Sequence, residues 1–205
     1  MAAKKKSLHA AERDSPRVQQ ARTNYREMIE SLDVSRLKFV DESGVNLALT
    51  RRYGRAPKGV RVVGAVPRNY GQHVTILGAL SLAGIEAVMT VAGATDAAVF
   101  RAYVKHVLGP TLLPGDIVLL DNLSVHKVTG LQQMLARRRT RLRYLPPYSP
   151  DLAPIELSWS KLKTYLRQAQ ARTHDALAAA IAQALATITP ADARAWFAHC
   201  GYAVQ

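Results

Sequence analysis

The chain has 205 residues, 48% of them hydrophobic, which is enough to bury the core of one α/β domain. Its single cysteine, Cys200, excludes an intrachain disulfide and a zinc site built from cysteines. No apolar run approaches the ~20 residues that a membrane span needs, and no apolar segment follows the N-terminal lysines as it would in a secretory signal. Twenty-eight Lys and Arg against 15 Asp and Glu give a net charge of +13, which favours a polyanion such as nucleic acid as partner.

Residues 1–36 are predicted to form a basic tail and a linker helix. Residues 1–14 are polar and basic, and we expect them to be disordered. Ser15 followed by Pro16 is typical of an N-cap and the first position of a helix. Apolar residues then recur at helical spacing, so this helix should dock on the rest of the chain; they are Val18, Ala21, Tyr25, Met28, Ile29 and Leu32.

Residues 37–205 are predicted to form the main domain, with C-terminal helices. The first strand spans residues 37–41 and ends at Asp41. Residues 51–64 are basic and rich in glycine and proline, which indicates a surface loop or a short hairpin. Two β-type runs, 73–82 and 85–91, are separated by Ala83 and Gly84, which predicts an antiparallel hairpin.

The second half of the chain alternates helices and strands. Thr95 is expected to cap a helix, and residues 117–120 are apolar throughout, as in a central strand covered on both faces. The remaining predicted elements are a helix at 130–139, a strand at 141–145, a long helix from Pro154, a helix at 174–187 and a short helix around Trp196. This order predicts an α/β fold with a mixed sheet, an antiparallel hairpin plus parallel strands, flanked by helices.

Three acids are the candidate catalytic and metal-binding residues. Asp41 and Asp121 each follow an apolar strand, and Glu156 lies in the first turn of the long helix. If the two strands are parallel neighbours, both aspartates emerge at the carboxyl edge of the sheet. Carboxylates bind hard divalent cations through oxygen, and two such ions catalyse phosphodiester cleavage. An isolated Glu156 would more simply complement the helix dipole, and Asp151 is the one rival as third acid, although it is better placed to cap the turn before the helix.

The long helix presents two stripes. Ile155, Trp159, Leu162 and Leu166 recur at the spacing of a buried face. On the adjacent stripe, Lys163 and Arg167 follow Glu156 along the same ridge, where they would contact phosphates that flank the scissile one. Trp159 is therefore interpreted as a core residue.

Three segments resemble the DDE transposases of bacterial insertion sequences related to the mariner superfamily. They are residues 39–44 (FVDESG), 120–127 (LDNLSVHK) and 145–156 (LPPYSPDLAPIE), with residues 53–59 (YGRAPKG) in between. The resemblance covers roughly residues 37–170. It implies an RNase H-like fold in which Asp41, Asp121 and Glu156 match the catalytic acids of the family and bind two Mg²⁺ ions, with Mn²⁺ as a substitute.

The implied function is metal-dependent cleavage of DNA at transposon ends, followed by attack of the freed 3′-hydroxyl on target DNA. The implied partners are DNA and either a second copy of the chain or the product of an upstream reading frame that carries the helix-turn-helix modules of the family, for which residues 1–36 are too short. The implied location is the bacterial cytoplasm, on the nucleoid. The residues predicted to contact DNA are Arg51, Arg52, Lys58, His126, Lys127, Lys163 and Arg167.

Two other functions remain open from the sequence. One is a DNA-binding or interaction protein derived from a transposase, which competes for ends or pairs with full-length copies. The other is a nuclease or resolvase on the same fold, which cuts branched or RNA-containing substrates. His126 is equally well explained as a helix-entry residue with ordinary hydrogen bonds.

Overall fold

The computed structural model describes residues 9–122 and 129–204. Within them lies a five-stranded sheet in the order β3-β2-β1-β4-β5. The strands are β1 (Leu37–Val45), β2 (Val74–Ser81), β3 (Gly84–Ala92), β4 (Ile117–Leu120) and β5 (Arg141–Tyr144). β1 and β3 pair antiparallel with β2, whereas β4 pairs parallel with both β1 and β5. The predicted mixed sheet and its antiparallel hairpin are therefore confirmed.

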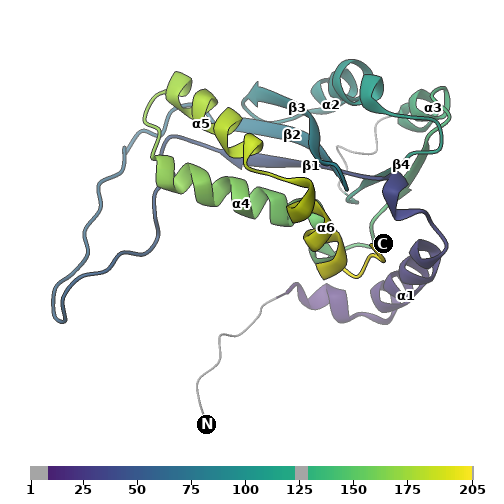
Figure 1. The fold of residues 1–205 in the computed structure, drawn as a ribbon, viewed down its shortest axis with the longest axis horizontal. Coiled ribbons are helices and arrows are strands. Elements are labelled where there is room, and N and C mark those ends of the chain that lie inside the picture. The colour runs from purple at the N-terminus through teal and green to yellow at the C-terminus, as the bar shows by residue number, and fades with distance from the viewer. Residues whose placement is uncertain (1–8, 123–128, 205) are drawn as a thin grey trace, which may run out of the picture.

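Helices cover both faces of this sheet (Figure 1). One face packs against α1 (Pro16–Glu30), α4 (Pro154–Ala169), α5 (His174–Ala186) and α6 (Pro190–His199), and the other against α2 (Ala97–Tyr103) and α3 (Leu131–Ala136). Strand alternation produces the two cores: Phe39 of β1 packs edge-on against Phe197 of α6, with ring centroids 5.3 Å apart, while the next residue, Val40, joins the core under α2.

The central strand β4 is buried at all four positions, as its apolar sequence predicted. It lies between β1 and β5, so side chains on both of its faces are covered by helices. The buried stripe of α4 is also confirmed, because Ile155, Trp159, Leu162 and Leu166 are each 2% exposed or less.

Two predictions about helix starts were wrong in detail. α1 begins at Pro16 as expected, but the Ser15 hydroxyl donates to the Glu12 carbonyl and does not cap the helix. Residues 11–14, which were expected to be disordered, form a 3₁₀ turn; residues 1–8 lie outside the described part. α2 is capped by Asp96, whose carboxylate accepts from the Val99 amide at 2.8 Å, and not by Thr95, because Asp96 is the residue that directly precedes the helix.

The connection from β1 to β2 projects from the body of the molecule as a long loop (Figure 1). We call its residues 51–66 the arm; they contain no helix or strand and are exposed throughout. Among the described residues no single helix is long and apolar enough to cross a membrane. Of the described helices, only α5 and α6 taken together have the length and composition, but they are bent by 75° at their junction and contribute to the core.

Candidate active site

The register of the parallel strands brings two of the predicted acids together. Phe39 of β1 pairs with Leu119 of β4. Two residues further along each strand direction are Asp41 and Asp121, and because side chains alternate with a period of two, both carboxylates leave the same face as this pair. The prediction that the first strand ends at Asp41 was wrong, because β1 continues to pair with β2 as far as Val45.

The third acid completes the group from α4. A pocket of about 450 Å³ is lined by Asp41, Asp121 and Glu156, together with Asn122 and the loop before α4. A larger hollow of about 750 Å³ lies between α1 and the C-terminal segment, but it contains none of the predicted acids. The chemistry therefore points to the smaller pocket.

Trp159 fixes the orientation of Asp41. Its indole Nε1 donates a hydrogen bond to Asp41 Oδ2 at 3.0 Å, although the side chain is otherwise buried in the core. The sequence identified Trp159 as a core residue and missed this contact. The available signal was its position three residues after Glu156, which places it on nearly the same side of the helix.

The three acids affect one another's pKa values. The pKa of Asp41 is raised to about 7, first by burial and then by the charges of Glu156 and Asp121, although hydrogen bonds from the Glu42 amide and Trp159 oppose the rise. Burial likewise raises the pKa of Glu156, Lys163 lowers it, and Asp121 raises it. Neighbouring carboxylates disfavour each other's ionisation, and a cation bound between them would remove this repulsion.

These residues fit a divalent metal by the chemistry of their donors. Carboxylate oxygens are hard ligands of the kind that Mg²⁺ and Mn²⁺ prefer, and their mutual repulsion favours a bound cation. Within residues 9–122 and 129–204 no three His, Cys, Asp or Glu side chains already form a coordinating group. Asp41, Asp121 and Glu156 are the residues that would hold a divalent metal ion.

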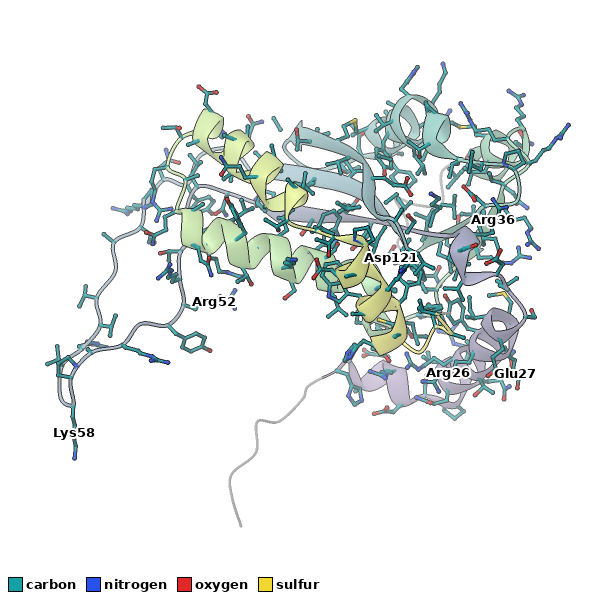
Figure 2. All side chains as sticks on the ribbon, in the orientation of Figure 1. Arg26, Glu27, Arg36, Arg52, Lys58 and Asp121 are labelled. Carbon is teal, nitrogen blue, oxygen red and sulfur yellow. The ribbon has the colours of Figure 1, made fainter. Side chains whose placement is uncertain are left out.

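The predicted DNA contacts divide into two sets. On α4, Lys163 lies close enough for its charge to lower the pKa of Glu156, and Arg167 is half-buried further along the helix. Arg52 and Lys58 lie on the arm, away from Asp121 in the body of the molecule (Figure 2), and Arg51 begins the same segment. The structure does not bring these three to the pocket. His126 and Lys127 lie outside the described residues.

Asp151 is not a third acid, nor does it cap a turn. Its carboxylate accepts from Arg22 Nη1 at 3.0 Å and Nη2 at 2.7 Å, and from Arg13 at 3.0 Å. Burial alone would raise its pKa, but the hydrogen bond and charge of Arg22, together with the charge of Arg13, lower it. Arg22 Nη1 also donates to the Ser149 hydroxyl at 2.6 Å. These bonds tie α1 to the loop that enters α4.

Comparison with known proteins adds two findings. Residues 36–178 match the family model described as DDE superfamily endonuclease. No curated protein matches the chain significantly.

Solved structures with a similar fold are of Mos1 transposase. The Mos1 transposase paired-end complex with left transposon end is 15% identical, with a TM-score of 0.72, over 97% of this chain and 62% of that one. The mariner Mos1 paired end complex with Mg is 14% identical, with a TM-score of 0.71, over 98% and 65%. The catalytic domain of Mos1 mariner transposase is 14% identical, with a TM-score of 0.61, over 97% and 98%. The chain thus spans less than two thirds of the paired-end chains and nearly all of the catalytic domain, and its RNase H-like fold is as predicted.

Proposed function

Because the chain belongs to the DDE superfamily of endonucleases, we propose that it is the catalytic domain of a transposase, which cuts DNA at transposon ends and joins the freed 3′-hydroxyl to target DNA. The observation that carries this proposal is the convergence of Asp41, Asp121 and Glu156 on one pocket. The paired-end complexes of Mos1 transposase with transposon ends, which share the fold, support it.

The residues of the pocket have separable roles in this proposal. Asp41, Asp121 and Glu156 would hold the metal, and Trp159 orients the Asp41 carboxylate by donating to one of its oxygens. Lys163 lies near Glu156 on the same helix and holds a phosphate of the bound strand. When bound, divalent ions supply activation of the nucleophile and stabilisation of the leaving oxygen.

A first test is the metal dependence of cleavage. The full chain incubated with duplex DNA is expected to nick it in Mg²⁺ or Mn²⁺ and to lose all nicking in excess chelator, because the divalent ions supply the activation of the nucleophile and the stabilisation of the leaving oxygen. Gel analysis of end-labelled DNA measures this. Nicking that persists in chelator contradicts the proposal, and a preference for branched or RNA-containing substrates over duplex ends would indicate a resolvase or nuclease instead.

We further propose that the transposase acts as a pair of copies, joined through the arm. Tyr53 and Val63 of the arm are 90% and 85% exposed, and Val60, Val62 and Val66 are about half exposed or more. Apolar side chains gathered on a projecting segment indicate a surface that another chain covers. A second copy is the partner that a two-ended DNA substrate requires, and the paired-end complexes of Mos1 support this choice.

The role of the arm in pairing can be tested with two variants, one that changes its apolar residues and one that changes its basic residues. Tyr53→Ser with Val63→Ser should lower the dimer fraction on DNA by about tenfold or more, because each lost apolar anchor costs roughly 1–2 kcal/mol. The matched control, Arg55→Gln with Lys58→Gln, should weaken DNA binding and leave pairing intact. Light scattering of the DNA complex measures both. A wild-type chain that stays monomeric on DNA would exclude the pairing.

The origin of the chain in a bacterial insertion sequence, with a separate helix-turn-helix product to read the ends, is part of the proposal. It is supported by the three segments around the acids. Flanking inverted repeats beside an upstream frame with helix-turn-helix motifs would identify such an element, and flanks without repeats would argue against it.

A further inference from the structure

Two stretches of the chain contain basic residues without any acid, and none of these basic residues lines the carboxylate pocket. Residues 97–115 carry Arg101 and Lys105, and residues 129–150 carry five arginines at 137, 138, 139, 141 and 143, so the two stretches hold seven cations and no Asp or Glu. All seven are exposed. A charge distribution this one-sided attracts anions even in a protein whose overall charge is already positive.

The two stretches meet in a groove. Its walls are Arg101 and Lys105, on α2 and the π-helical turn that continues it (Val104–Leu108), and Arg137 and Arg138, just after α3. The groove has a volume of about 430 Å³. Its floor is apolar, formed by Val104, Met134 and Leu135.

Gly109 leaves room for the side chain of Arg138 beside the groove. A Cβ atom added at Gly109 would lie 2.8 Å from Arg138 Nε, so only a residue without a side chain lets the guanidinium rest there. Arg101 is steadied by a hydrogen bond from its Nη2 to the Thr129 carbonyl at 3.3 Å. Both side chains are therefore positioned near the groove by contacts with neutral groups, which do not neutralise their positive charges.

The groove cations are not neutralised by the protein. Among the described residues, none of the ion pairs within 4.0 Å involves Arg101, Lys105, Arg137 or Arg138. By contrast, Arg13, Arg22 and Lys161 elsewhere on the surface and in the core each have a carboxylate partner. Unpaired cations on both walls of a concave surface are suited to a polyanion that fills it.

We propose that this groove binds the phosphate backbone of duplex DNA, at a segment that lies outside the carboxylate pocket. The inference rests on the proposed function, which supplies DNA as the substrate. The groove is on the α2–α3 face of the sheet, whereas Glu156 enters the pocket from α4 on the opposite face. The two sites therefore contact different stretches of DNA, one cut and one held.

Duplex DNA explains the groove better than an acidic protein does. Protein interfaces are centred on large apolar or aromatic anchors, but Val104 and Leu135 of the floor are almost fully buried and offer little area. Four long cationic side chains around a shallow floor match instead the contacts that position a nucleic acid backbone without reading its sequence.

The test is the salt dependence of DNA binding in excess chelator, so that the carboxylate pocket and its metal play no part. Arg101→Gln with Arg137→Gln removes one cation from each wall while leaving Arg138 on Gly109. Each lost phosphate contact lowers the slope of log affinity against log salt by about 0.9 and the affinity at ~0.1 M salt by roughly tenfold. The matched control is Arg26→Gln with Arg194→Gln, which removes the same charge from exposed sites on α1 and α6.

The expected result is a slope smaller by about 2 in the groove variant, independent of the DNA sequence, with the control close to wild type. An equal decrease of the slope in both variants would show that only the net charge of the protein matters. An unchanged slope in the groove variant would show that DNA does not contact the groove. Either result overturns the proposal. Tighter binding of polyglutamate than of duplex at equal charge would assign the groove to an acidic protein. Because binding is read without metal, its outcome is independent of whether the chain cleaves DNA.

Discussion

Asp121→Asn is expected to abolish DNA nicking and strand transfer, by at least about 10³-fold, while the protein stays folded. The change removes one charged ligand from the pocket, and a catalytic metal accounts for several kcal/mol of transition-state stabilisation. Folding should be unharmed or slightly favoured, since the charge of Asp121 is one of the causes that raise the pKa of Asp41 and its removal relieves that repulsion. Loss of activity together with retained or increased stability is typical of a residue kept for function.

The control for this variant is Glu27→Gln, which removes one acid from the exposed surface of α1 (Figure 2). It should leave the nicking rate unchanged in the same gel assay, and thermal unfolding should be measured for both proteins. Undiminished nicking by Asp121→Asn would remove this aspartate from the catalytic group. A large fall in melting temperature would instead make its role structural.

Arg22→Met is expected to lower the free energy of unfolding by about 3 kcal/mol, which corresponds to a melting temperature lower by roughly 6–12 °C for a chain of this size. The Arg22 side chain is 3% exposed and forms hydrogen bonds to both oxygens of Asp151 and to Ser149. Its loss leaves a partly buried carboxylate and a buried hydroxyl without their main partner. Urea denaturation of the purified chain measures the difference.

Arg13→Met is the matched control, because Arg13 pairs with the same carboxylate but its side chain is 25% exposed; it should cost less than about 1 kcal/mol. The difference between wild type and Arg22→Met should also depend on pH. The folded pKa of Asp151 lies below the ordinary aspartate value of 3.8, so the stabilisation is present above that value and is lost as the pH falls through the lower, folded pKa. Equal effects of the two variants would refute the buried role.

The sequence predicted those parts of the fold that depend on local pattern. The apolar run of β4, the buried stripe of α4 and the hairpin of β2 and β3 all follow from periodicity, and the pairing of Asp41 with Asp121 followed from two strands assumed to be parallel neighbours. The position of Asp41 in the middle of β1 was not predicted, because the length of β1 is set by its pairing with β2 as well as by its own sequence.

Contacts between distant segments were beyond the reach of the sequence. Trp159 donates to Asp41 across 118 positions, and Arg22 reaches Asp151 across 129. Nothing in the local pattern around Arg22 distinguishes a buried cation from its solvated neighbours on α1, and Asp151 was consequently interpreted as a local cap. The basic groove was not predicted for the same reason, since its two walls are separated in the chain and meet only in the folded protein.

The order in which the acids occur along the chain has a consequence for biosynthesis. Asp41 and Asp121 leave the ribosome before α4 does, so the pocket lacks Glu156 and the indole that donates to Asp41 until α4 has emerged and docked. A nascent or prematurely terminated polypeptide that ends before this helix carries most of the basic surface and no assembled cutting centre. If the proposed function is correct, such fragments would occupy DNA without breaking it.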